Sequence, residues 1–175
     1  MARNIELKVQ LVDRAAVETA LSTLGANCEW TRKQRDTFYD VPTGWLKLRE
    51  AEDAPPELMS YHRAAETDPR PSDYEVRTLD DANAWHRLLA HVLPVRGVVA
   101  KERTLWLWRH TRVHLDQVEN LGSHLELETV LDGIDEKQGF DENAHVIEAL
   151  GIARAPRLSV PYLELLEQVN SKSRH

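Results

Sequence analysis

The sequence predicts an α+β fold in which a mostly antiparallel sheet of eight strands is combined with a few helices. Three observations lead to this class. Hydrophobic and polar residues alternate with a period of two in eight segments, whereas helical spacing occurs in only four. The chain has 175 residues, 42% of them hydrophobic, which is enough for one sizeable core. Eight strands is also the number at which a closed barrel is just wide enough to hold a small ligand.

The first strand is the clearest of the eight, because apolar and polar residues alternate strictly from Ile5 to Leu11. Turn-forming residues separate several of the others, for example Pro42 and Gly44 between the second and third. The predicted strands are residues 5–12, 35–40, 45–50, 58–64, 74–79, 98–107, 112–118 and 124–131.

The first predicted helix has the most complete pattern, with Asp13 as its N-cap, an apolar stripe, and Gly25 at its end. We expect Asp141 to open the third helix, and the fourth begins with Pro161, which the first turn of a helix tolerates. We expect one domain over residues 1–170 and a frayed tail over residues 171–175. The predicted helices are residues 14–24, 82–92, 141–150 and 161–169.

The composition argues against several classes of protein. Lys and Arg number 22 against 29 Asp and Glu, a net charge of −7, which disfavours binding to a nucleic-acid polymer. No apolar run approaches the roughly 20 residues of a membrane helix, and the first residues lack a signal-peptide pattern. The single cysteine, Cys28, cannot form an internal disulfide and is expected to be a small buried hydrophobic side chain. We therefore expect a cytoplasmic protein without membrane contact.

The polar positions of the predicted strands are unusually ionic, and 16 of the 22 basic residues are arginine, whose planar fork suits phosphate and carboxylate. Residues two apart on a strand share one face. These sets are Glu6 and Lys8; Lys47 and Arg49; Tyr61 and Arg63; Glu75 and Arg77; Lys101 and Arg103; Arg112, His114 and Asp116; and Glu126 and Glu128.

Two interpretations of these ionic faces are open. The faces could lie in water, where cross-strand ion pairs are common and individually weak. Alternatively they could line a tunnel, where so many buried charges would be costly unless a ligand and a metal ion complete them. Basic groups would take phosphate oxygens, and carboxylates a hard metal ion that bridges those oxygens.

Five segments carry a resemblance to a known family. Residues 4–8 (NIELK) are similar to an N-terminal ExExK signature, and residues 34–50 (QRDTFYDVPTGWLKLRE), 72–75 (SDYE), 99–103 (VAKER) and 112–131 (RVHLDQVENLGSHLELETVL) follow in matching order. Together they resemble the CYTH superfamily, the triphosphate tunnel metalloenzymes, and within it the class IV adenylyl cyclase-like and thiamine triphosphatase-like branch. The resemblance runs from about residue 3 to residue 131, with a weaker echo at residues 161–166.

This resemblance implies an eight-stranded antiparallel β-barrel with flanking helices, a tunnel that binds a triphosphate together with Mg²⁺ or Mn²⁺. It implies that Glu6, Glu126 and Glu128 are catalytic metal ligands, with Asp116 as a further acidic group near the metal. The residues that it places along the phosphate path are Lys8, Lys47, Arg49, Arg63, Lys101, Arg103 and Arg112.

Three single residues need separate interpretation. Asn4 stands where the signature has its first Glu, which removes one negative charge and would weaken a second metal ion. Tyr39 is a candidate catalytic residue whose phenol would position water in the tunnel, the alternative being a tyrosine packed at a strand end. His114 is expected either to orient a phosphate or to be a satisfied structural histidine.

Three functions follow from these expectations. The first is metal-dependent hydrolysis of a phosphoanhydride bond in tripolyphosphate, a nucleoside triphosphate or thiamine triphosphate. The second is an adenylyl cyclase that converts ATP to cyclic AMP and pyrophosphate, and it is less favoured because no segment stands out as an adenine pocket. The third, motivated by Asn4, is a triphosphate sensor with little turnover. A small-molecule triphosphate is the expected partner, and exposed helices would allow a homodimer.

Overall fold

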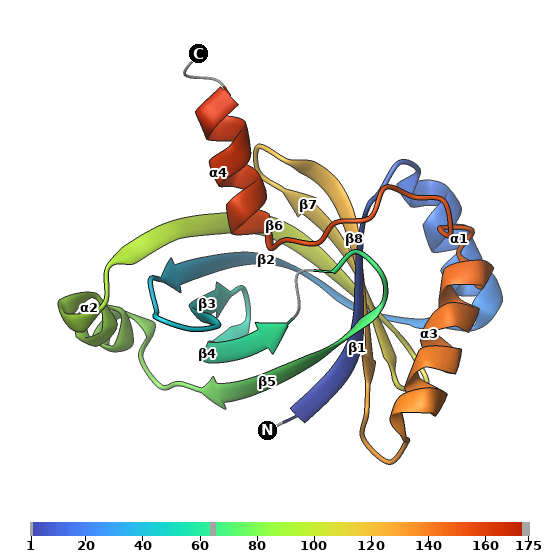
Figure 1. Cartoon of the computed structure of the whole chain (residues 1–175), viewed down its shortest axis with the longest axis horizontal. Helices are drawn as coiled ribbons and strands as arrows, with labels where there is room; N and C mark the ends of the chain where they lie inside the picture. Colours follow the sequence, from blue (N-terminus) through green and yellow to red (C-terminus); the bar gives the residue numbers. More distant parts are fainter. Residues whose placement is uncertain (1, 64–65, 173–175) are drawn as a thin grey trace.

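A computed structural model describes residues 2–63 and 66–172, and its eight strands close into an antiparallel barrel (Figure 1). The order around the barrel is β1-β5-β4-β3-β2-β6-β7-β8, so that β1 closes the sheet by pairing with both β5 and β8. The predicted fold class is confirmed. The strands are β1 (Ala2–Gln10), β2 (Asn27–Tyr39), β3 (Trp45–Ala51), β4 (Ala54–Arg63), β5 (Arg70–Thr78), β6 (Val95–Trp108), β7 (Thr111–Val118) and β8 (Gly122–Val130).

Four helices flank the barrel: α1 (Arg14–Leu24), α2 (Ala82–Val92), α3 (Glu136–Ala149) and α4 (Tyr162–Lys172). In Figure 1, α1 and α3 lie together on the side of β1 and β8, and α2 lies at the opposite end of the molecule. Within the described ranges, no helix has the length and apolar character needed to cross a membrane.

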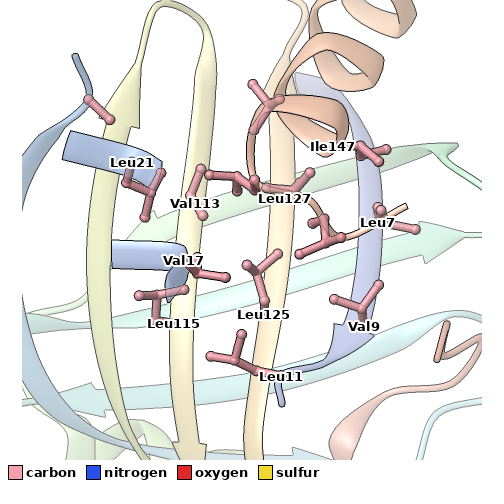
Figure 2. Close-up of a cluster of buried hydrophobic side chains, with 14 residues drawn as sticks. Leu7, Val9, Leu11, Val17, Leu21, Val113, Leu115, Leu125, Leu127 and Ile147 are labelled. Carbon is pink, nitrogen blue, oxygen red and sulfur yellow. The ribbon is translucent and has the colours of Figure 1, made fainter. Parts of the chain in front are cut away.

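The largest hydrophobic core lies outside the barrel, between its wall and two helices (Figure 2). Leu7, Val113 and Leu127 project from the outer faces of β1, β7 and β8, and they pack against Val17 of α1 and Ile147 of α3. Because successive side chains of a strand point to opposite faces, the residues between these apolar ones point into the barrel. The polar residues that alternate with the core are thereby directed to the interior.

Two smaller hydrophobic clusters attach the remaining helices. Tyr39 and Leu48 are buried against Trp85 and Leu89 of α2. At the start of α4, Tyr162 belongs to a second cluster with Phe38, Val99, Val118 and Leu163.

The third helix begins earlier than predicted. Its N-cap is Asp135 rather than Asp141, and Asp135 forms a capping box with Gln138, each side chain accepting a hydrogen bond from the other residue's backbone N–H. Gly139, which is unfavourable inside a helix, lets α3 approach the barrel closely. A Cβ atom there would lie 2.3 Å from Leu131 and 3.3 Å from Ile5.

Several predicted strand ends are also wrong. β2 starts at Asn27 instead of residue 35, because the polar segment before residue 35 is held by pairing with β6, from Asn27 opposite Leu107 onward. Cys28 lies in this segment and is exposed, not buried. β5 starts at Arg70 instead of residue 74, where it pairs with β1. The first strand ends before Val12, whose side chain is 86% exposed.

The C-terminal helix is longer than predicted. It continues to Lys172, so the first two residues of the expected tail are helical, and the Ser171 hydroxyl donates a hydrogen bond to the Gln168 carbonyl. Residues 173–175 of that tail lie outside the described residues.

We expect Leu127→Ala to lower the free energy of unfolding by about 2–5 kcal/mol, because Leu127 is fully buried in the core between the barrel and α3. Urea denaturation monitored by circular dichroism would measure it. The control is Val12→Ala, at an exposed site, which should change stability by less than about 0.5 kcal/mol. A loss below about 1 kcal/mol for Leu127→Ala would mean that this cluster contributes little to stability.

Candidate functional site

The barrel encloses a cavity of about 640 Å³ that is lined from all eight strands. Among the described lining residues, basic groups outnumber carboxylates. Because the ionic residues of the strands line this cavity, their faces point into the barrel instead of facing bulk water. Glu75 and Arg77 are the exception, since both are exposed on the outer face of β5. The basic lining residues are Lys8, Arg32, Lys47, Arg49, Lys101, Arg103 and Arg112, and the acidic ones are Glu6, Asp36, Glu57, Glu126 and Glu128.

One group of charges is centred on Asp36 of β2. Arg49 donates through Nε to Oδ1 at 2.7 Å and through Nη2 to Oδ2 at 2.9 Å. Lys47 and Lys101 donate to Oδ2 at 3.0 and 2.7 Å. The three cations come from β3 and β6, the two neighbours of β2, and Asp36 is only 2% exposed. We call these four residues the cation cluster; it keeps an excess of positive charge because one carboxylate serves three cations.

Burial shifts the pKa values in the cation cluster. It lowers the pKa of Lys101 to about 7, against the opposing effect of Asp36, with Arg49 and Arg103 lowering it further. It also lowers the pKa of Lys47 to about 8, together with the charge of Arg49. Burial opposes ionisation of Asp36, but Arg49, Lys101 and Lys47 together hold its pKa well below the usual range. The Asp36 carboxylate is therefore ionised at neutral pH, whereas Lys47 and Lys101 both titrate close to neutral pH.

Arg103 of β6 lies between the cation cluster and the strands β7 and β8, which follow β6 around the barrel. It donates to both oxygens of Asp116 at 2.7 and 2.6 Å, and to Oε2 of Glu126 at 2.8 Å. The Tyr162 hydroxyl, at the start of α4, also donates to Asp116 at 2.9 Å. Lys8 of β1 lies 3.0 Å from the other oxygen of Glu126. Both oxygens of Asp116 are thus occupied by Arg103 and Tyr162, which assigns Asp116 to positioning Arg103.

A second group lies further along the barrel wall and consists of His114, Glu126 and Glu128, which we call the ligand cluster. Its potential ligand atoms lie within 4.8 Å of one another, and the three side chains project from the neighbouring strands β7 and β8. Burial opposes ionisation of Glu126, but Lys8, His114 and Arg103 hold its pKa well below the usual range. Burial and then Arg103 lower the pKa of His114, which favours the neutral imidazole. A neutral imidazole and two carboxylates are a donor set that fits a divalent cation.

Glu6 is opposite Glu128 in the register of β1 and β8, and its Oε1 lies 3.4 Å from Arg70 Nη2. It is therefore next to the ligand cluster along the wall but pairs with a cation. Asn4, the departure from the family signature, is buried on the same face of β1, and its Oδ1 has no hydrogen-bond partner among the described residues.

Most of the predicted site residues line one cavity. The structure brings together Glu6, Lys8, Lys47, Arg49, Lys101, Arg103, Arg112, Glu126 and Glu128. Arg112 is the most open of these, 3.6 Å from Glu128 with its side chain 41% exposed. The side chain of Arg63 lies outside the described residues.

Two predicted roles need correction on geometric grounds. Tyr39 has the outward parity of β2, where its hydroxyl meets Nδ1 of His86 at 2.9 Å beside α2, so its phenol does not enter the tunnel. Asp116 is inside the barrel as expected, but it is bound to Arg103 and is not part of the ligand cluster.

Sequence reasoning missed several lining residues, above all Asp36, the centre of the cation cluster. Arg32 and Gln34 precede it on β2 and also line the cavity. The fully buried Arg70, which opens β5 and contacts Glu6, was missed as well. Arg32, Gln34 and Arg70 lie in the parts of β2 and β5 that precede the predicted strand starts, which are several residues too late because these segments do not alternate clearly. The one available signal was the spacing of Gln34, Asp36 and Phe38, which share a face in any strand that includes them.

The site is thus a closed barrel with an ionic interior, in which cations are in excess along β3, β2 and β6, and an imidazole and two carboxylates gather along β7 and β8. The chain belongs to the CYTH domain family, whose family model matches residues 2–157. Among curated proteins, no significant match is found.

Solved structures similar to this chain share its fold at low sequence identity. The PH1012 protein of Pyrococcus horikoshii superposes with a TM-score of 0.79 at 21% identity, over 93% of this chain and 98% of that one. A proposed adenylate cyclase from Vibrio parahaemolyticus gives 0.75 at 19%, over 94% and 97%. HpAC1 from Hippeastrum, a proposed adenylyl cyclase with a dominant triphosphatase activity, gives 0.62 at 14%, over 91% of each chain.

We expect Asp36→Asn to destabilise the protein by about 3–5 kcal/mol, because it leaves Lys47, Arg49 and Lys101 buried without their counter-charge. Added sulfate or tripolyphosphate should restore much of the loss by supplying anionic oxygens. Thermal and urea denaturation, with and without the anion, would measure both effects. The control is Glu29→Gln on the exposed part of the same strand, which should change neither quantity. Equal stabilisation of both variants by the anion would contradict this role for Asp36.

Proposed function

We propose that this protein hydrolyses a phosphoanhydride bond of a linear triphosphate held in the barrel together with a divalent cation. One observation carries the proposal: the cation cluster and the ligand cluster face the same cavity, and Arg103 spans the space between them. A triphosphate chain needs cations along its length and a metal ion at the reacting end. Side chains that suit both requirements line one cavity, which supports the proposal.

The cation cluster would bind the oxygens of the terminal phosphates. Arg49, Lys47 and Lys101 now share a single carboxylate, so entering phosphate oxygens would add acceptors to cations that are already oriented by Asp36. Little reorganisation would be needed, and the enclosed site strengthens each interaction relative to water. Arg103 and Lys8, next to Glu126, would contact the phosphate that lies between the cation cluster and the ligand cluster.

Glu126 and Glu128, with Glu6 beside them, would hold the divalent cation. When bound, such an ion polarises a phosphoryl oxygen and lowers the pKa of a coordinated water. The chain's own contribution is to keep Glu126 ionised through Lys8 and Arg103. Mg²⁺ and Mn²⁺ are the ions to test first, since both bind carboxylate oxygens and bridge phosphates.

Hydrolysis is preferred to cyclisation because of the comparison with the Hippeastrum protein, since both reactions would use the same charged groups. Both clusters address phosphate oxygens or a metal ion, and the Hippeastrum protein of similar fold is described by its dominant triphosphatase activity. Cyclisation of ATP and binding without turnover are the alternatives, and the assay of the reaction products distinguishes them from hydrolysis.

The test is release of phosphate from tripolyphosphate, ATP and thiamine triphosphate, with Mg²⁺, Mn²⁺ or chelator. We expect chelator-sensitive release of phosphate, and we expect Glu128→Gln to reduce it by at least about 100-fold, because the variant removes a charged oxygen donor from the ligand cluster. The matched control is Glu102→Gln, an exposed carboxylate on β6, which should leave the rate unchanged.

Other products would change the assignment. Cyclic AMP with pyrophosphate would replace hydrolysis by cyclisation. If no product forms but tripolyphosphate raises the melting temperature, the tunnel binds without turnover. Full activity of Glu128→Gln would remove this residue from the metal site.

The pH dependence of binding gives an independent prediction. The pKa of Lys101 is about 7 in the free protein, and an adjacent polyanion would raise it, so binding above pH 7 takes up a proton. Affinity for tripolyphosphate should therefore fall as pH rises from 7 to 9, by up to about tenfold per unit from this lysine. Lys101→Arg stays charged and should show a shallower fall by calorimetry. Parallel curves for the two proteins would contradict the assignment, and comparing them cancels the ligand's own ionisation.

A further inference from the structure

His114 is the one member of the ligand cluster to which the family resemblance gives no metal role. It lies in the middle of β7, points into the barrel and is 6% exposed. Its Nδ1 atom is 3.9 Å from Glu126 Oε2 and 3.8 Å from Glu128 Oε1. Both distances exceed the 2.7–3.2 Å range of a hydrogen bond. Nδ1 has no hydrogen-bond partner among the described residues, although it is buried and faces two carboxylates.

A buried polar atom without a partner destabilises the folded protein, so the arrangement requires an explanation. The neighbouring carboxylates do not have this feature, because Asp36 and Asp116 are bound directly by cations. The two oxygens of Glu126 likewise contact Lys8 and Arg103, so the unpartnered atom of the ligand cluster is Nδ1 of His114. Among the described residues, only His114, Glu126 and Glu128 bring three potential metal-ligand atoms close together without hydrogen bonds between them.

The spacing fits a shared ion. Two ligand atoms bound to the same divalent cation, each at about 2.0–2.2 Å, can lie at most about 4.4 Å apart. The separations of 3.8 and 3.9 Å from Nδ1 to the two carboxylates fall within this limit. The ion would also satisfy the imidazole nitrogen and neutralise the charge of Glu128, which lies 3.6 Å from the partly exposed Arg112.

The nitrogen donor bears on which metal is selected. Mg²⁺ prefers a shell of oxygen ligands, whereas imidazole suits first-row transition metals and zinc, whose affinities for a mixed site rise toward Zn²⁺ and Cu²⁺. We propose that His114 is a direct nitrogen ligand, through Nδ1, to a divalent cation held with Glu126 and Glu128, and that this nitrogen makes the site prefer Mn²⁺ or Zn²⁺ to Mg²⁺. The inference deepens the proposed function, because it concerns the same cavity, but it does not require turnover.

The experiment uses the metal-stripped full chain with Mn²⁺ alone and measures nitrogen hyperfine coupling by pulsed electron paramagnetic resonance. We expect an imidazole nitrogen signal in the wild type that changes on ¹⁵N-histidine labelling and disappears in His114→Ala. The matched control is His91→Ala, an exposed histidine of α2, which should keep the signal. If His114→Ala does not fold, His114→Gln replaces the ring by a side chain of similar length.

Metal selectivity provides the second readout. Even outer-shell partners of metal ligands change affinity by 10–100-fold, so loss of a direct ligand should weaken Zn²⁺ binding by at least about tenfold. Mg²⁺ binding should change much less, so the preference for Zn²⁺ over Mg²⁺ should narrow in His114→Ala. Calorimetric titration of both proteins would measure this.

Four results would overturn the inference: Mn²⁺ binding without nitrogen coupling, which would assign a water to Nδ1; coupling that persists in His114→Ala; no Mn²⁺ binding with or without tripolyphosphate; or equal loss of Zn²⁺ and Mg²⁺ affinity. Failure of the phosphate-release assay would leave a positive nitrogen signal intact. Normal hydrolysis without that signal would overturn this inference alone.

Discussion

The interior of this barrel depends on one constraint: the charges that closure of the sheet turns inward and buries must be compensated. β1 hydrogen-bonds to β5 and to β8, so no open edge remains among these strands and the inward side chains are shielded from bulk water. Burying an ion costs several kcal/mol unless an opposite charge and hydrogen bonds compensate. The cation cluster around Asp36 and the bidentate contact between Arg103 and Asp116 meet this requirement.

The compensation of charge is unequal around the barrel. Three cations share Asp36 along β3, β2 and β6, whereas Glu126, Glu128 and a neutral imidazole gather along β7 and β8. A ligand with several negative charges would pair with the cation cluster, and a cation bound at one end of it would pair with the ligand cluster. Because the groups are already oriented and partly dehydrated, their electrostatic effect on such a ligand is larger than in water.

Stability and site geometry are coupled through the strands themselves. Leu127 lies between Glu126 and Glu128 in sequence but points outward into the core formed with α1 and α3. The same alternation places Leu7 between Glu6 and Lys8. The helices therefore position the inner face by packing on the outer one, and Gly139 permits the close approach of α3 that this packing needs.

The alternation of residues determined the class of fold and which charged side chains share a face, because a period of two assigns each side chain to one face whatever the rest of the chain does. It placed Glu6 with Lys8, Lys101 with Arg103, and Glu126 with Glu128, and the family resemblance supplied the roles expected of these residues. Alternation was insufficient in β2, where the strand is specified by its long pairing with β6 and not by a clear hydrophobic pattern. Only the structure showed that the Asp36 side chain points into the barrel and the Tyr39 side chain points outward.

The sequence by itself determined which charges share a strand face, since that depends only on local backbone geometry. Which charges meet across strands was decided by the tertiary structure. Asp36 contacts Lys47, Arg49 and Lys101 because β3, β2 and β6 are neighbours in the barrel, and His114 faces Glu126 and Glu128 because β7 pairs with β8 in one register. Those contacts depend on strand order and register, which arise from barrel closure and the packing of the outer core rather than from any local pattern.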